Sequence, residues 1–491
     1  MITWGISANS HDAAIAVFKD RQLVYASHSE RYSRVKNDGD LDLTMVNELK
    51  AKYGEPDRIV WYENPWAKSF RQLFAGQGFK FSENNVKDYL RKFNIRAPIT
   101  YKWHHETHAA AGYYTSPFDE ATVVVIDAIG EFETISVWKG EGNKLKKLWS
   151  QNYPDSIGLW YSAMTDRIGL KANEEEYILM GMAALGDPMR LSGDMIADFI
   201  NFYHPSEHGI LFKQNLHKGC KDWRPDLIAD WDRYDIAAGT QHVYELIFHK
   251  ILQDAVRLNR SPNLVLMGGC ALNCVANVDA YTYFKNVWIM PNPGDAGSAV
   301  GAVLADWQEH IEWPGAYLGY DMGYKHTNTE IVDYLLENKI CGLARGRAEY
   351  GPRALGNRSL IADPRGPEVK DLLNAIKKRE DFRPFAPAVL AEHAHDIFEM
   401  PTELTPYMQY AVKCKKPNVY PAIVHLDGTS RVQTVTREDN PEFHALLTAW
   451  YERTGCPMLV NTSLNIKGEP IVNTHLDADR WENKYGIPIF R

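Results

Sequence analysis

A strand–turn–strand pattern occurs twice in this chain, and it constrains the fold more than any other feature. The first copy has short apolar or β-branched segments at residues 2–7, 13–18 and 22–27, with polar turn residues between them. The second copy has such segments at residues 122–127 and 134–138. Short β-rich segments bounded by turn residues are typical of hairpin strands. We therefore expect an α/β protein with two similar halves, each carrying a polar turn that can face a ligand.

The rest of the chain also predicts alternating helices and strands. Residues 240–259 have helical spacing, and residues 263–267 form a short apolar segment that ends in two glycines. A second alanine-rich helix is expected at residues 295–307, and a new strand at residues 340–344. The glycine-rich stretch 313–326 indicates a linker, which places a domain boundary near residue 330. We expect one domain over residues 1–330 and another over residues 335–491.

The composition is that of an ordinary globular protein. The chain has 491 residues, 45% of them hydrophobic and 24% charged, with a formal net charge of −9. That balance argues against a surface that coats nucleic acid, although it allows a local basic pocket. Six cysteines without a CxxC pair favour a reducing compartment over a disulfide scaffold. We see neither a signal-peptide pattern nor an apolar run of membrane-spanning length, and we expect a cytoplasmic protein without a membrane partner.

An arginine-rich, glycine-rich stretch lies in the final third. Glycine lets the backbone approach a ligand closely, and arginine binds phosphate or carboxylate with two parallel hydrogen bonds. This pattern predicts a site for a small, highly charged anion, and the alternative is a solvated basic loop. The arginines concerned are Arg345, Arg347, Arg353 and Arg358.

A pair of histidines suggests a metal site. His104 and His108 are spaced i, i+4 at the start of an expected helix, so both imidazoles share one helical face and can bind one divalent metal. Imidazole suits iron, zinc, nickel or copper, whereas magnesium prefers oxygen. Asp295 lies in a glycine-flanked turn before another expected helix and offers a carboxylate. The alternative is a polar helix start with incidental histidines.

Two further turns could bind a nucleotide. Gly268 and Gly269 follow an apolar strand and precede Asn273, so their backbone N–H groups could face phosphate or ribose. Asp127 ends another strand close to Gly130, where a carboxylate could accept a proton or hold a metal-bound phosphate. Tight packing and ordinary turn chemistry are the alternatives for both.

Several separated motifs together resemble the O-carbamoyltransferase family, whose members carbamoylate nodulation factors, cephamycins and aminoglycosides. The resemblance covers residues 2 to about 478, and its blocks occur in the family's order. They are NSHDAA at 9–14, ERYSRVK at 30–36, GGCALN at 268–273, YGPRALGNRS at 350–359, NAIKKREDFRPFAP at 374–387 and NTSLN at 461–465. The resemblance implies a duplicated actin/hexokinase-like domain over 1–330 and a YrdC-like domain over 335–491. Ile178, at a usual lysine position, and a short C-terminal segment depart from the family pattern.

The resemblance also implies roles for individual residues. The metal ligands would be His104, His108 and Asp295, with Fe(II) as the family's metal. The catalytic residues of the transfer step would be His11, Asp12, Lys36 and Asp127. The nucleotide and carbamoyl-phosphate contacts would come from Gly130, Gly268, Gly269, Asn273, Arg347, Arg353, Arg358, Lys377, Arg379, Arg383, Ser463 and Asn465. Lys377 and Arg379 are two residues apart, so both would point to one face if they lie on a strand.

The implied reaction consumes ATP, with Mg²⁺, and carbamoyl phosphate. It forms carbamoyl adenylate and transfers the carbamoyl group to a hydroxyl of a small molecule, a sugar or a nucleoside. The resemblance further implies a homodimer. Two alternatives stay open: an enzyme similar to the tRNA threonylcarbamoyl transferases, and a catalytically silent nucleotide-binding protein of the same fold.

Overall fold

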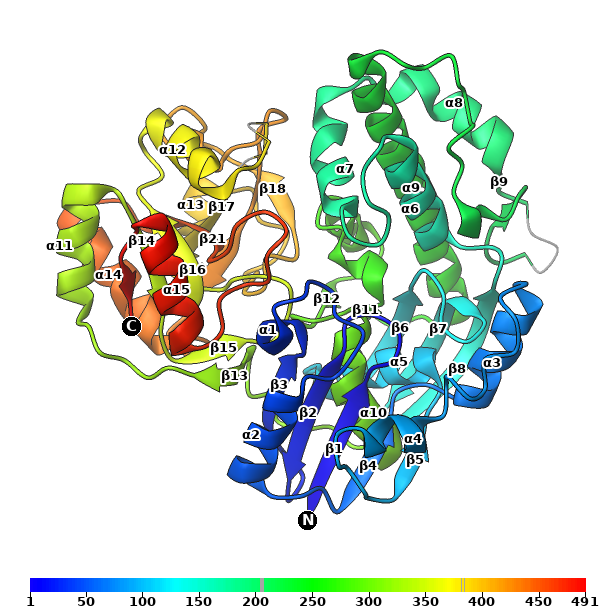
Figure 1. Ribbon diagram of the computed structural model, residues 1–491. Helices are drawn as coiled ribbons and strands as arrows, with labels where there is room; N and C mark the ends of the chain where they lie inside the picture. The colour runs from blue at the N-terminus through cyan, green and yellow to red at the C-terminus, as the bar shows by residue number, and fades with distance from the viewer. Residues whose placement is uncertain (204–206, 381, 384) are drawn as a thin grey trace. The chain divides into compact units, whose positions relative to one another are not determined.

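The computed structural model describes residues 1–203, 207–380, 382, 383 and 385–491, and it is a mixed α/β structure (Figure 1). The chain forms two compact units. The first comprises Met1–Val24 and Gly39–Trp313, and the second comprises Tyr25–Asp38 and Pro314–Arg491. A short stretch near the N-terminus therefore belongs to the same unit as the C-terminal third of the chain.

The first unit contains two five-stranded sheets with the same strand order. One has the order β3-β2-β1-β4-β5, and the other has the order β8-β7-β6-β11-β12. In each, the first strand pairs antiparallel with the second and parallel with a later strand. The strands are β1 (Ile2–Ser7), β2 (Ala14–Lys19), β3 (Gln22–His28), β4 (Arg58–Trp61), β5 (Ile99–Tyr101), β6 (Glu120–Ile126), β7 (Glu133–Glu141), β8 (Lys144–Asn152), β11 (Asn263–Met267) and β12 (Asn286–Trp288). This repeat confirms the two similar halves that the sequence predicts.

Two small-residue helices cross at the centre of this unit. Helix α5 (His104–Thr115) contains three consecutive alanines, and helix α10 (Ser298–Trp307) is also alanine-rich. At Gly301 a Cβ atom would lie 1.9 Å from the carbonyl oxygen of Thr107, so the two backbones touch there. A Cβ atom on Gly5 would lie 1.8 Å from the carbonyl oxygen of Ala299 in the same way. These contacts fix β1, α5 and α10 closely together, which positions the site described below.

The remaining elements of the first unit surround the sheets. Pro65 and Pro188 each begin a helix, as proline does readily because its missing N–H is not needed there. The helices are α2 (Leu43–Tyr53), α3 (Pro65–Phe74), α4 (Val86–Arg91), α6 (Ile157–Arg167), α7 (Glu176–Met182), α8 (Pro188–Phe199) and α9 (Asp230–Leu258), with the short strands β9 (Ile200–Asn201) and β10 (Leu211–Phe212). Among the described helices, none combines the length and apolar character needed to cross a membrane.

The second unit is built on a six-stranded mixed sheet of order β20-β17-β21-β16-β14-β22. Its strands are β14 (Ile340–Ala344), β16 (Arg358–Ala362), β17 (Ala386–Leu390), β20 (Gln433–Val435), β21 (Met458–Ser463) and β22 (Ile489–Phe490). The helices are α1 (Glu30–Ser33), α11 (Asn328–Asn338), α12 (Pro367–Lys377), α13 (Ala394–Ile397), α14 (Pro441–Thr454) and α15 (His475–Tyr485). Two small pairs complete the unit, β13 (Tyr317–Asp321) with β15 (Arg347–Glu349) and β18 (Ala411–Lys413) with β19 (Thr429–Arg431).

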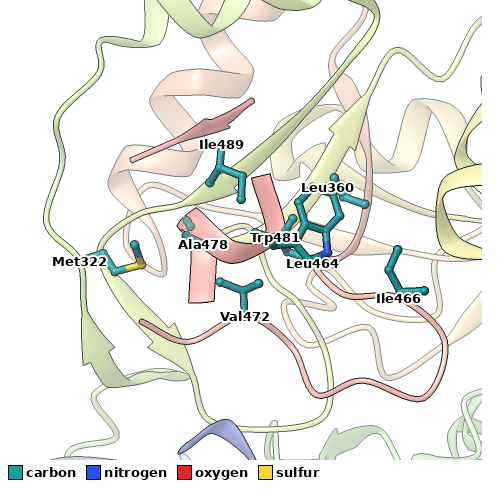
Figure 2. Close-up of a cluster of buried hydrophobic side chains, with 9 residues drawn as sticks. Met322, Leu360, Leu464, Ile466, Val472, Ala478, Trp481 and Ile489 are labelled. Carbon is teal, nitrogen blue, oxygen red and sulfur yellow. The ribbon is translucent and has the colours of Figure 1, made fainter. Parts of the chain in front are cut away.

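A buried apolar cluster holds the segment that follows β21. Leu464, Ile466 and Val472 from this segment pack with side chains of the sheet and of α15 (Figure 2). The full cluster is Met322, Ala344, Leu360, Leu464, Ile466, Val472, Ala478, Trp481 and Ile489. Because apolar residues alternate with polar ones here, burial of the former fixes the direction of Ser463 and Asn465.

Most of the predicted elements are confirmed, including strands 263–267 and 340–344 with their bounds. One prediction is wrong. The stretch 313–326 is not simply a linker, because Tyr317–Asp321 forms β13 and pairs with β15. Lys377 and Arg379 do not share a strand, because Lys377 is the last residue of α12 and Lys378 ends the helix in the left-handed conformation. Positions 381 and 384 of that motif lie outside the described residues.

Candidate functional site

Four buried side chains converge in the first unit. His104, His108, Asp127 and Asp295 each present one ligand atom, and these atoms all lie within 4.8 Å of one another. The Nε2 atoms of the two histidines are 3.0 Å apart. His104 Nε2 lies 3.1 Å from Asp127 Oδ2, and Asp295 Oδ1 lies 3.4 Å from His104 Nε2 and 3.3 Å from His108 Nε2. The predicted histidine pair and Asp295 are therefore brought together.

Local structure explains why these residues meet. The two histidines share one face of α5 because they are one turn apart. Asp127 directly follows β6, and Asp295 lies in the turn that leads into α10. The close crossing of α5 and α10 brings Asp295 to the histidines. Sequence spacing could join only the histidine pair; the other two carboxylates arrive through the tertiary fold.

The charges in this cluster compensate one another. Burial alone would raise the pKa of Asp295, but the charges of His104 and His11 and hydrogen bonds from the α5 histidines hold it well below its usual range. Burial and the nearby charge of Asp295 would also raise the pKa of Asp127. The hydrogen bond from His104 and the charges of His108 and His104 instead lower the pKa of Asp127 to about 2. Burial disfavours a charged His104, yet the charge of Asp295 and a hydrogen bond to Asp127 raise its pKa well above 6.5.

The donor set fits a divalent transition metal. Two imidazole nitrogens and two carboxylate oxygens converge on one small buried space, and such mixed nitrogen and oxygen ligands suit iron, zinc or manganese. Asp127, which the resemblance assigns to catalysis, is within ligand distance as well. In the sequence, Asp127 is marked only by its position directly after an apolar strand. That position does not by itself distinguish a metal ligand from a catalytic acid.

His11 extends the cluster toward solvent. It lies in the turn between β1 and β2, where its Nδ1 is 3.1 Å from Asp12 Oδ2 and its Nε2 is 3.4 Å from Asp295 Oδ2. The charge of Asp295, followed by the hydrogen bond with Asp12, raises the pKa of His11 above 6.5. Asp295 thus has one oxygen toward the buried histidines and the other toward the exposed His11.

The predicted glycine turns lie around the same cluster. The amide of Gly269 donates to Asp127 Oδ1 (3.1 Å), and the amide of Gly268 donates to the carbonyl of Pro293 (2.9 Å). Gly130 is so close to the rings of His104 and His105 that an added Cβ atom would lie 3.1 Å from each.

Asn273, the remaining predicted residue of these turns, belongs to a buried amide network. Its Nδ2 donates to Gln241 Oε1 (3.0 Å), which also accepts a hydrogen bond from the Tyr161 hydroxyl (2.9 Å). The structure therefore places Asn273 in a rigid polar setting beside the turn.

Glu131 follows Asp127 and Gly130 in the same turn, but the resemblance gives it no catalytic or ligand role. Its side chain is 3% exposed and accepts hydrogen bonds from the backbone N–H groups of Asn64 (2.7 Å) and His104 (3.1 Å). It therefore ties the first residue of α5 to the chain just before α3. Burial raises the pKa of Glu131 to about 7. An acidic residue shortly after a strand-end turn was the only signal in the sequence.

A second cluster lies in the other unit and is centred on Lys377. Its side chain is 5% exposed, and Nζ donates to Ser463 Oγ (3.1 Å) and Asn465 Oδ1 (2.7 Å). The backbone carbonyls of Ser463 and Asn465 also accept from Nζ, at 2.5 and 2.7 Å. Three residues that the resemblance assigns to nucleotide and carbamoyl-phosphate contacts, Lys377, Ser463 and Asn465, therefore meet, although Lys377 comes from the end of a helix.

Two arginines, Arg379 and Arg383, lie near Lys377, and Arg383 also forms an ion pair with Glu380 (3.3 Å). Burial lowers the pKa of Lys377 well below 10.5, and the charges of Arg379 and Arg383 lower it further. Arg379 lies over the ring of Phe385 at 3.9 Å and donates to the carbonyl of Arg383 (3.1 Å). This arrangement is suited to an anion, because a negative ligand would relieve the repulsion among the cations.

The arginines of the glycine-rich stretch have mainly structural contacts. Arg358 is fully buried, and its guanidinium donates to backbone carbonyls of Tyr320, Arg345, Gly346, Asn357 and Asn473. Arg347 donates to the carbonyls of Leu318 and Gly319, and Arg353 is half-buried. Arg358 could bind a ligand only by giving up backbone contacts, so the anion-binding role of this stretch stays a prediction.

Lys36 is not in the same unit as the residues with which the resemblance groups it. His11, Asp12 and Asp127 belong to the first unit, whereas Lys36 lies within Tyr25–Asp38 of the second.

Comparisons with known proteins show the family of this chain. The family described as Carbamoyltransferase N-terminus matches residues 3–304, and Carbamoyltransferase C-terminus matches residues 332–489. An uncharacterized protein of Synechocystis is 34% identical, with 97% of this chain and 93% of the relative covered. Nodulation protein NolNO of Sinorhizobium fredii is 30% identical, with 95% and 76% covered. The 3'-hydroxymethylcephem-O-carbamoyltransferase of Amycolatopsis lactamdurans is 29% identical, with 97% and 95% covered. The chain belongs to the carbamoyltransferase family and is an enzyme that transfers a carbamoyl group.

Proposed function

We propose that this protein is an ATP- and carbamoyl-phosphate-dependent O-carbamoyltransferase that works through carbamoyl adenylate. The observation that carries the proposal is the buried Lys377, held by Ser463 and Asn465 beside Arg379 and Arg383. A cluster of cations and hydrogen-bond donors of this kind suits substrates that carry several phosphate charges. We assign this activating step to the second unit, as a YrdC-like domain.

The proposed reaction has an activating step and a transfer step. Water cleaves carbamoyl phosphate to carbamate and inorganic phosphate, and a carbamate oxygen then attacks the α-phosphorus of ATP, with Mg²⁺ on the phosphates. The products are carbamoyl adenylate and pyrophosphate. An acceptor hydroxyl attacks the carbamoyl carbon, loses its proton to a base and releases AMP. Adenylation is needed because carbamate alone has a poor leaving group.

We assign the transfer step to the first unit, as a duplicated actin/hexokinase-like domain. His104, His108, Asp127 and Asp295 would hold one divalent metal, for which we propose Fe(II), and such an ion supplies Lewis-acid polarisation of a carbonyl when bound. His11 is the exposed group beside this cluster, oriented by Asp12. It is positioned to accept the proton of an acceptor hydroxyl, with Gly268, Gly269 and Asn273 close to the nucleotide.

We propose a small hydroxylated acceptor, such as a sugar, an antibiotic-type molecule or a nucleoside. The name of the Amycolatopsis relative places its acceptor hydroxyl on a hydroxymethyl group of a cephem. The net charge of −9 gives no support for a nucleic-acid partner. A homodimer and a cytoplasmic location complete the proposal.

The test is pyrophosphate release by purified, metal-loaded protein supplied with Mg²⁺ and ATP, with and without carbamoyl phosphate. We expect release only when both substrates are present. Release that does not require carbamoyl phosphate, or no release from a folded protein that carbamoylates an acceptor directly from carbamoyl phosphate, would contradict the adenylate route.

A further inference from the structure

The turn that carries His11 depends on contacts from outside it. Asn9 and Asp12, on either side of Ser10 and His11, both have a left-handed backbone, with φ of 65° and 53°. Ser10 and His11 are exposed. Residues other than glycine keep a left-handed backbone only where the surrounding structure holds them in it. The position of His11 is therefore set by the residues that bind this turn.

Asn9 is the residue through which the turn is held. Its amide donates to the carbonyl of Gly39 (2.7 Å), and its Nδ2 donates to the carbonyl of Glu83 (3.0 Å). Its own carbonyl accepts a hydrogen bond from Lys68 Nζ (3.0 Å). Gly39 and Glu83 contribute backbone atoms, whereas Lys68 contributes a side chain. Lys68 is thus the contact that a single substitution can remove.

Lys68 is buried together with a carboxylate. Lys68 is 5% exposed and Glu63 is 6% exposed, and Lys68 Nζ lies 2.7 Å from Glu63 Oε1. A buried ion pair contributes little to stability by itself, because the cost of removing both charges from water offsets their attraction. The charge of Lys68 is matched by Glu63, and the same ammonium group reaches the Asn9 carbonyl. The pair is better explained by the geometry that it imposes on Asn9 than by stability.

The ion pair lies on the framework that also supports the metal cluster. Asn64 follows Glu63 directly, and its side chain caps the N-terminus of α3, the helix that contains Lys68. The amide of Asn64 donates to Glu131 Oε1 (2.7 Å), and Glu131 also accepts from the amide of His104. A continuous set of hydrogen bonds and short chain segments therefore connects His104 to the turn of His11.

We propose that Lys68 is a positioning residue for the transfer step: by binding the Asn9 carbonyl, it keeps His11 facing Asp295. The inference rests on the proposed function, in which His11 accepts the proton of the acceptor hydroxyl. His11 Nε2 lies 3.4 Å from Asp295 Oδ2 in the observed turn. A general base must lie within hydrogen-bond reach of its proton, so a displacement of about 1 Å slows the reaction strongly.

The first measurement is hydrogen exchange of the Asn9 amide in the full-length protein, followed by mass spectrometry. We expect exchange about tenfold faster in Lys68→Met, because the turn loses one charge-assisted hydrogen bond. The double variant Lys68→Met/Glu63→Gln removes the unpaired buried carboxylate and should show the same increase. Glu63→Gln alone leaves Nζ on Asn9 and should exchange nearly as the wild type does. The matched control is Lys87→Met, which removes an exposed lysine of the same unit.

The second measurement asks whether Lys68 acts through His11. With carbamoyl phosphate, Mg·ATP and glycerol as the probe acceptor, we expect Lys68→Met/Glu63→Gln to lower formation of glycerol carbamate by about 10- to 100-fold. Pyrophosphate release without glycerol should be unchanged, since it belongs to the second unit. In a His11→Asn background the same substitutions should have little further effect, because the group that they position is gone.

The outcomes separate the two proposals. Exchange of the Asn9 amide at the wild-type rate in both lysine variants would overturn the inference. An equal loss of glycerol carbamate in the wild-type and His11→Asn backgrounds would also overturn it, because a residue with a purely structural role lowers both alike. Absence of carbamoyl-phosphate-dependent pyrophosphate release in the wild type would overturn the adenylate route, while the exchange measurement would still decide the inference.

Discussion

The two clusters of this protein handle buried charge in opposite ways. In the first unit, His104 and His108 face Asp127 and Asp295, so positive and negative groups compensate one another before any ligand arrives. In the second unit, Lys377 is buried near Arg379 and Arg383, and among the described residues its hydrogen-bond acceptors are neutral oxygens of Ser463 and Asn465. A buried cluster whose positive and negative charges compensate one another is stable before a cation binds, whereas a cluster with an excess of positive charge favours an anion. This difference in charge is the one we expect between the proposed metal site and the proposed phosphate site.

The two clusters also differ in the elements that support them. The histidines and Asp295 lie on or beside two helices whose backbones touch, so their positions are set by rigid packing. Lys377 lies at a helix end, and its partners are Ser463, the last residue of β21, and Asn465 in the following loop, which is held by buried apolar residues and by Arg34. We expect the second cluster to be the more sensitive to changes in the surrounding segments.

The largest effect is expected from removing the central lysine. Lys377→Met should lower pyrophosphate release by about 100-fold or more, as loss of an electrostatic stabiliser does, while bound metal stays unchanged. The control is Lys325→Met on the surface of the same unit. Normal release in Lys377→Met would contradict the assignment of the cluster.

The same variant tests the sign of the pH dependence of stability. Because the pKa of Lys377 is lowered in the folded protein, the unfolded chain binds more protons between that lowered pKa and 10.5. The free energy of unfolding should therefore rise with pH across this window, and Lys377→Met should lose that slope. Denaturant unfolding at several pH values measures it, and an unchanged slope would show that Lys377 is not the cause.

The balanced cluster should be broken by removing one ligand. Asp295→Asn and His108→Ala should each reduce the metal bound per protein chain, measured by elemental analysis after dialysis, because each leaves the donor set incomplete. His105→Asn is the control, since His105 bonds Ser136 (2.8 Å) instead of joining the cluster. Full metal content in either ligand variant would remove that residue from the site.

A smaller effect is expected from the residue that holds His104 in place. Glu131→Ala should weaken metal affinity by about 10- to 100-fold, because the backbone of His104 loses its acceptor. Glu131→Gln keeps an oxygen in the same position and should bind metal nearly as the wild type does. Equal loss in both variants would show that the negative charge of Glu131, and not its hydrogen bonds, matters.

The smallest effect is expected at the contact between Tyr25–Asp38 and the rest of the second unit. Arg34→Met leaves the carbonyls of Pro470 and Ile471 without their donor and should lower the free energy of unfolding by about 1–3 kcal/mol. Arg453→Met, which removes an exposed ion pair with Asp333, should change it by about 0–1 kcal/mol. Equal stability of the two variants would show that Arg34 does not hold the segment.

Much of the fold could be predicted because the local pattern was strong. The strands around residues 2–7 and 122–127 follow directly from short apolar runs bounded by turns, and the histidine pair follows from helical spacing. The two-residue spacing of Lys377 and Arg379 does not distinguish a strand from a helix end, and the structure places Lys377 at the end of α12. The glycine content of residues 313–326 predicts a linker and gives no sign of the short strand β13.

Local sequence determined the elements, the pairing of His104 with His108 and, through several ordered motifs, the family. Only the tertiary structure decided that Asp127 and Asp295 meet those histidines, that Arg358 binds backbone carbonyls, and that Lys36 joins the second unit. The physical reason is the sequence separation over which each kind of interaction acts. Helical and strand periodicity act over a few residues, whereas charge compensation, burial and close backbone contact depend on groups that lie far apart in the chain and meet only after folding.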